Sequence, residues 1–156
     1  MPNLKPLSKK ITTQIRFILE GIKSGTLEHD QEYVHCGSAH CVAGWYAVIK
    51  AEARGVKYDS SKDGFDDGPT EFDDALSLAQ KDWRLTDDER YILFSADATL
   101  TVQFALLKYL ESGERVNDAD YAYQNETLVA VSQESLVTTP FISYLQQQNI
   151  VQNNSC

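Results

Sequence analysis

Residues 8–24 have the sequence SKKITTQIRFILEGIKS, and this stretch decides the expected fold class. Its apolar residues recur at the spacing of an α-helix and share one face. Gly25 follows directly, and glycine commonly closes a helix because it adopts the left-handed conformation without strain. The pattern predicts an amphipathic helix that packs against a core through Ile11, Ile15, Ile18, Leu19 and Ile22.

Comparable patterns predict further short to medium helices, five or six in all. One is expected from Ser38, a good N-cap, to Gly55. Another follows Pro69-Thr70, and a third follows the capping box Thr86-Asp87-Asp88-Glu89, in which hydroxyl and carboxylate satisfy each other's backbone donors. The remaining helices are expected after Thr99, ending at Gly113, and from Thr139-Pro140 through Gln148.

Residues 114–136 give the weakest pattern of the chain. Thr127 to Ser132 alternates like a β-strand, but a helix from Asp118 to Gln133 also fits the sequence. No internal repeat or long linker divides the chain. We therefore expect an all-α fold, with residues 1–148 as a single compact domain, a short strand at 127–132 as the exception, and a frayed tail at 149–156.

Composition and charge restrict the function classes. Of the 156 residues, 42% are hydrophobic, as in a globular protein, and 14 basic residues face 23 acidic ones. The formal charge of −9 opposes phosphate, which disfavours DNA, RNA and anionic lipid and favours cations and basic protein partners. The basic residues are scattered along the sequence, so no nucleic-acid patch is predicted.

No membrane span is predicted either. The longest uncharged apolar run is Cys41–Ile49, far short of the roughly 20 residues that cross a bilayer. The three cysteines occur without a signal peptide, which predicts reduced thiols and a cytoplasmic location.

The acidic insert at residues 56–70 is the part of the sequence that most clearly suggests a specific ligand. Seven of the 23 acidic residues lie between Asp59 and Asp74, and counting from Asp59 gives a partial match to the calcium loop of an EF-hand. The match fails at position 8, which is Asp66, and at position 12, which is Thr70. The sequence therefore predicts either a solvated acidic loop or a looser calcium site. The predicted calcium ligands are Asp59, Ser61, Asp63, the carbonyl of Phe65, Asp67 and Glu71.

A second cluster, His35, Cys36, His40 and Cys41, brings four metal-ligating side chains into residues 35–41. Zinc sites usually combine two separated pairs of ligands, and no second pair follows in this sequence. The favoured interpretation is that the two cysteines are small buried side chains, with Cys41 facing the core beside Val42 and Trp45. A metal or thiol site at 35–41 is the alternative.

The stretch Cys36-Gly37-Ser38-Ala39-His40-Cys41-Val42-Ala43-Gly44-Trp45 resembles a motif of the form C-G-[ST]-x-x-C-[IVL]-A-G-[WH] in a scattered group of uncharacterised bacterial and phage proteins. Members often carry L-T-x-x-E and then L-F, as in Leu85–Glu89 and Leu93-Phe94 here. The likeness covers residues 36–95. The group has no established activity, so the resemblance implies a helical fold and little else.

No glycine-rich phosphate loop, nucleophile elbow or H-E-x-x-H sequence occurs in the chain. The leading prediction is accordingly a non-enzymatic helical domain with an interaction or regulatory role and a protein partner. Calcium binding or buffering through residues 59–71 is the first alternative. A thiol or metal site at residues 35–41 is the second.

Overall fold

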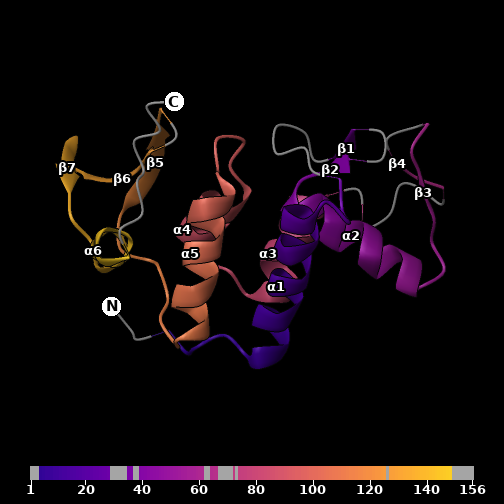
Figure 1. The fold of residues 1–156 in the computed structure, drawn as a ribbon, viewed down its shortest axis with the longest axis horizontal. Coiled ribbons are helices and arrows are strands. Elements are labelled where there is room, and N and C mark those ends of the chain that lie inside the picture. Colours follow the sequence, from indigo (N-terminus) through magenta and orange to yellow (C-terminus); the bar gives the residue numbers. More distant parts are fainter. Residues whose placement is uncertain are drawn as a thin grey trace.

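The computed structural model describes residues 4–28, 35–36, 39–61, 64–66, 72, 74–125 and 127–148. Helices form most of this part, with short antiparallel strands between them (Figure 1). The fold is therefore mixed α/β and rich in helix, and the expected all-α class is wrong. The helices are α1 (Lys9–Ser24), α2 (Val42–Ala53), α3 (Ala75–Trp83), α4 (Asp87–Phe94), α5 (Leu100–Glu111) and α6 (Pro140–Gln147).

The all-α prediction fails mainly at residues 114–136, where a three-stranded antiparallel sheet of order β5-β6-β7 forms. Its strands are β5 (Asp120–Gln124), β6 (Thr127–Ser132) and β7 (Ser135–Val137). The predicted strand at 127–132 is confirmed as β6, and the alternative helix from Asp118 to Gln133 is wrong. Leu128 and Ala130 are buried on one face of β6, which is the period of two that a half-buried strand requires.

The turn between β6 and β7 explains why this hairpin was not predicted. Gln133 and Glu134 both adopt positive φ angles, 51° and 63°, as the two-residue turn of a hairpin requires. Such turns usually contain asparagine or glycine, and neither is present here. Strand β7 is also exposed along its whole length, so it lacks the alternation that marks a strand.

Helix α1 confirms the predicted first helix. The Ser8 hydroxyl accepts a hydrogen bond from the Ile11 N–H at 3.3 Å, and Gly25 closes the helix with φ of 81°. Leu27 then folds back over the helix, and its N–H donates to the Gly21 carbonyl at 3.0 Å. A Cβ atom on Gly21 would lie 2.6 Å from Leu27 Cδ1, so any other residue here would require the Leu27 side chain to shift.

Two predicted helix starts are wrong. Helix α2 begins at Val42, after strands β1 (His35–Cys36) and β2 (Ala39–His40) pair antiparallel; Ser38 lies outside the described residues. Its N-cap is Cys41, and cysteine is not a usual capping signal. Helix α3 begins at Ala75, where the Asp74 carboxylate accepts from the Ser77 N–H at 3.2 Å and caps the helix; Pro69 and Thr70, the predicted start, lie outside the described residues.

The other helix starts are confirmed. Thr86 and Glu89 form both hydrogen bonds of the predicted capping box at α4. The hydroxyls of Thr99 and Thr139 cap α5 and α6, and Pro140 occupies the first turn of α6. In each case one side chain satisfies backbone donors that the helix leaves open, which is why the residue type alone located the start.

The buried apolar residues form one cluster around α1, α3 and α5, and α1 lies between α5 and α2 (Figure 1). Trp83 of α3 is fully buried, and its indole N–H donates to Gln14 Oε1 of α1 at 3.0 Å. The sheet and α6 cover the far side of α5, where the Phe141 and Tyr109 rings lie 5.1 Å apart. Within the described residues, no helix has the length and apolar character of a membrane span.

Candidate functional site

A groove of about 1010 Å³ runs beside α1, bounded by α2, the end of α3 and residues 5–8. Its described lining contains six of the 14 basic residues of the chain but one of the 23 acidic residues, Asp82. The lining therefore carries five net positive charges in a chain of formal charge −9. We call this surface the basic groove. Its cations are Lys5, Lys10, Lys50, Arg54, Arg84 and Arg115.

The side of the basic groove formed by α1 contains both polar and apolar residues. Ile11 and Ile18 line it at the edge of the core, and Phe17 projects beside them with 63% of its surface exposed. The other large apolar side chains of α1 lie on the core face of the helix and are buried. Phe17 is thus a large aromatic side chain exposed to water in a groove that also contains six cations.

Two of the six cations are held by partners inside the protein. Lys50 pairs with Asp82, which also accepts a hydrogen bond from the Tyr46 hydroxyl at 2.6 Å. Burial would raise the pKa of Asp82, but the hydrogen bonds from Lys50 and Tyr46 hold it below its ordinary value. Arg115 binds the Glu89 carboxylate through two nitrogens, at 2.9 and 2.8 Å. These pairs fix the walls of the groove.

Lys5, Lys10 and Arg84 differ from Lys50 and Arg115 in their contacts. Within the described part of the chain, their side chains form no ion pair or hydrogen bond, and all three residues are exposed. They come from three separate segments: the chain before α1, the first turn of α1 and the end of α3. Charge that is already paired contributes little to binding a ligand, so these three cations are the ones available to an anionic group.

The frame beneath the groove is built from aromatic and amide contacts. The Tyr46 ring of α2 lies 4.7 Å from the Trp83 ring of α3, and Trp83 in turn donates its indole N–H to Gln14 of α1. Tyr46 and Gln14 both line the groove. Three helices are therefore locked together directly below the surface that carries Phe17, which keeps that surface in a defined shape.

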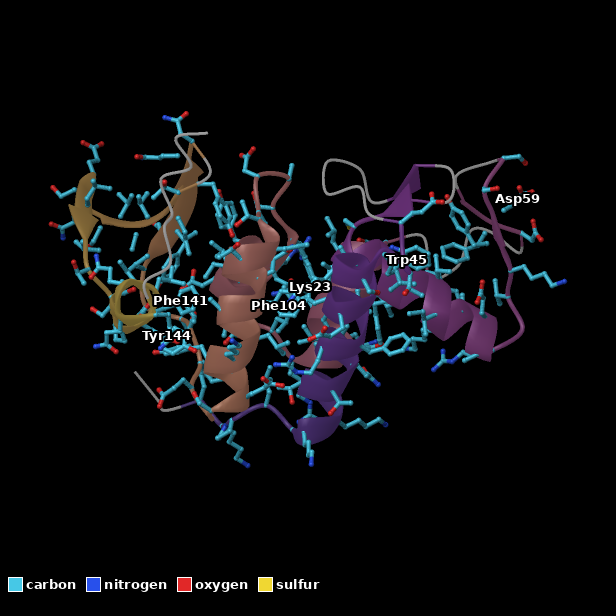
Figure 2. All side chains as sticks on the ribbon, in the orientation of Figure 1. Lys23, Trp45, Asp59, Phe104, Phe141 and Tyr144 are labelled. Atoms are coloured by element: carbon cyan, nitrogen blue, oxygen red, sulfur yellow. The ribbon has the colours of Figure 1, made fainter. Side chains whose placement is uncertain are left out.

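A smaller groove of about 550 Å³ lies on the other side of α1, between α1, α5 and α6. Lys23 places its Nζ 5.5 Å from the centre of the Phe104 ring, as Figure 2 shows for the two labelled side chains. Arg16 in this groove is bound by both Glu111 and Glu20. Arg16 is thus neutralised inside the protein, and the lining contains three cations against the six of the basic groove, so this groove offers less to an anionic ligand.

The structure describes three of the six predicted calcium ligands. Asp59 and Phe65 lie on strands β3 (Tyr58–Asp59) and β4 (Gly64–Phe65), which pair antiparallel, so this part of the predicted loop is a hairpin. Asp59 Oδ1 accepts hydrogen bonds from the Ser61 N–H at 2.9 Å and hydroxyl at 2.6 Å. The Phe65 side chain is buried and its ring packs edge-on against Tyr58.

The other three predicted ligands, Asp63, Asp67 and Glu71, lie outside the described residues. Among the residues that are described, no three His, Cys, Asp or Glu side chains gather in a way that could hold a metal ion. Calcium binding at 59–71 therefore stays a prediction. Asp59 lies near one end of the molecule, whereas Lys23 and Phe104 lie near its middle (Figure 2).

Of the predicted Cys/His cluster, the structure describes the side chain of Cys41. It is buried, as predicted, and its Sγ accepts a hydrogen bond from the Gly44 N–H at 3.4 Å. Trp45 is half-buried rather than part of the inner core, and its indole N–H donates to the Glu28 carbonyl at 2.6 Å. The side chains of His35, Cys36 and His40 are not among those described, so the thiol or metal alternative stays a prediction.

Comparison of the chain with protein-family models, with curated proteins and with solved structures gave no match. A functional assignment therefore rests on the geometry of the chain itself. The basic groove was not predicted from the sequence, because its cations are separated by up to 110 positions and lie on different elements. The exposed Phe17 was the available signal, since it falls outside the apolar face that defines α1.

Proposed function

We propose that the protein is a protein-interaction domain that binds a partner through the basic groove. The observation that carries the proposal is Phe17, which leaves 63% of its surface in water while the other large apolar residues of α1 are buried. Burying such a side chain contributes on the order of 1.5–3 kcal/mol. Aromatic anchors of this kind, ringed by polar residues, dominate the binding energy of many interfaces.

The surroundings of Phe17 support the same function. The groove is open and larger than most small-molecule pockets, which span roughly 300–1,000 Å³. Its walls are fixed by the Lys50–Asp82 pair and by the Trp83–Gln14 hydrogen bond, so little conformational freedom is lost on binding. An exposed aromatic side chain that shares a preformed groove with charged residues is consistent with a protein interface, where aromatic residues and arginine are enriched.

Site-specific photo-crosslinking tests the proposal. A photoreactive phenylalanine analogue placed at Phe17 is expected to give discrete protein adducts in extract from the native host. The matched control is the same analogue at Leu136, which is 67% exposed on β7 and remote from the groove. Adducts at Phe17 that are competed by excess unlabelled wild-type protein, and not by a Phe17→Ser variant, are the expected result. Identical adducts at the two positions would refute a role for the groove.

A further inference from the structure

We infer that the segment bound in the basic groove is an acidic, amphipathic helix of the partner. This inference rests on the proposed function and specifies the chemistry of its partner. The charge of the groove is the first reason, since its described lining carries six cations and a single acid. Lys5, Lys10 and Arg84 are exposed and form no ion pair with a described residue, so carboxylates of a partner would supply the missing counter-charges.

The net negative charge of the chain repels an acidic partner, whereas the cations of the groove attract it. The distance from the partner to each set of charges decides which effect is larger. At physiological ionic strength the Debye length is about 8 Å, so acidic residues farther away are largely screened. A carboxylate in contact with a lysine at the protein surface lies well inside this distance and is screened far less. The contacting cations therefore determine the preference of the groove, although the sequence as a whole favours basic partners.

The second reason is the spacing of Lys10 and Phe17 on α1. Both line the groove, and seven residues of α-helix separate them, which corresponds to about 10 Å along the helix axis. A partner helix that lies along α1 matches this spacing when an apolar side chain meets Phe17 and a carboxylate about two turns away meets Lys10. Apolar and acidic residues must then share neighbouring faces, which defines an amphipathic helix.

Phe17 distinguishes this partner from a nucleic acid, the other polyanion that six cations would attract. Phosphates would occupy the cations but leave the Phe17 side chain, which is 63% exposed, without apolar cover. A helix with leucine or phenylalanine anchors covers this side chain and supplies the anionic groups at the same time. An exposed aromatic side chain in a groove rich in cations therefore favours an acidic peptide.

Defined peptides test the inference by fluorescence anisotropy at 150 mM salt. The probe is a labelled 18-residue helix-forming peptide with leucines on one face and glutamates beside them. Its controls are the same sequence with every glutamate replaced by glutamine, and a scrambled order of equal composition. We expect the glutamate helix to bind at least tenfold more tightly than either control. Equal binding of the glutamine helix would overturn the acidic preference while leaving a Phe17-dependent interaction intact.

Two charge reversals on adjacent residues locate the contact. Lys10 lines the groove and its neighbour Lys9 does not, although both are exposed at the start of α1. Lys10→Glu is expected to weaken binding of the glutamate helix at least fivefold, and Lys9→Glu less than twofold, with unchanged melting temperatures. Equal losses would show that only the general charge of α1 matters and would overturn the inference.

A single-stranded oligonucleotide of equal charge serves as competitor. It is expected to displace the glutamate helix only at a much higher concentration. Displacement at equal concentration would assign the groove to nucleic acid instead. If no peptide binds while Phe17 still yields a competed protein adduct, the acidic-helix inference fails and the proposed function remains.

Discussion

Two arginine–glutamate contacts in this protein share the same geometry and differ in their surroundings. Arg115 donates from Nε and Nη2 to the carboxylate of Glu89, and Arg16 donates from the same two atoms to the carboxylate of Glu111. The Glu89 side chain is fully buried and that of Arg115 is 10% exposed, whereas Arg16 and Glu111 are 36% and 32% exposed. The difference shows how burial, rather than the contact itself, sets what an ion pair contributes.

The buried pair is completed by backbone groups. Glu89 also accepts from the N–H groups of Thr86 and Val116, both at 2.9 Å, and Arg115 also donates to the carbonyls of Lys5 and Arg84. This junction ties the start of α4 to the chain after α5 and to the segment before α1. The exposed pair joins α1 to α5 and can exchange its partners for water at little cost.

The largest effect is expected for Glu89→Gln. The variant removes the negative charge that Arg115 requires and presents an amide N–H₂ to backbone donors, which leaves buried groups without acceptors. We expect a loss of about 3–5 kcal/mol in the free energy of unfolding, measured by urea denaturation. Glu111→Gln is the matched control, with the same chemical change at the exposed pair. Similar losses for the two variants would contradict the role assigned to burial.

An intermediate effect is expected for Thr86→Ala at the same junction. The hydroxyl of Thr86 accepts from the Glu89 N–H at 3.0 Å and donates to the Val116 carbonyl. Its loss should cost about 1–2 kcal/mol in thermal or urea unfolding, toward the upper end of the usual range for helix caps. Thr86→Ser keeps the hydroxyl and should recover most of this free energy. A loss no greater than that of Thr99→Ala, which removes a cap without such a second bond, would argue against the junction.

The smallest effect belongs to the exposed pair, and it should depend on pH. The hydrogen bond from Arg16 is the main cause that holds the pKa of Glu111 below its ordinary value of 4.5. A lowered pKa in the folded state stabilises the protein above the ordinary value, and this contribution disappears as the pH falls through the lowered pKa. Glu111→Gln should therefore cost about 0.2–1 kcal/mol at pH 7 and approach wild-type stability in acid, as followed by thermal melts. A deficit that persists in acid would assign the effect to packing.

Local signals in the sequence were enough for the parts of the fold that depend on neighbours along the chain. Helix α1 follows from one apolar face, and α4 and α6 follow from Thr86 and Thr139 at their caps. The β5-β6-β7 sheet depends on pairing between strands. Its turn at Gln133 and Glu134 has left-handed backbone angles but contains no glycine or asparagine, the residues from which such a turn is predicted. Strand β6 alone was predicted, because only it alternates between buried and half-buried residues.

The basic groove could not be predicted from the sequence for a different reason. Lys5, Arg84 and Arg115 belong to three segments that meet only when α1, α3 and the chain after α5 pack together. The net charge of the whole sequence is negative, so it gives no sign of a local group of positive charges. The predicted acidic loop stays a prediction, because Asp63, Asp67 and Glu71 lie outside the described residues.

The close return of Leu27 over Gly21 has a consequence for the coupling of helices. Leu27 is followed by Glu28, whose carbonyl receives the indole N–H of Trp45 on α2. A methyl group at Gly21 would meet the end of the Leu27 side chain, which would have to move away from α1. The backbone of this return is held by the hydrogen bond from the Leu27 N–H to the Gly21 carbonyl, so the first helix determines where the chain meets Trp45 of the second.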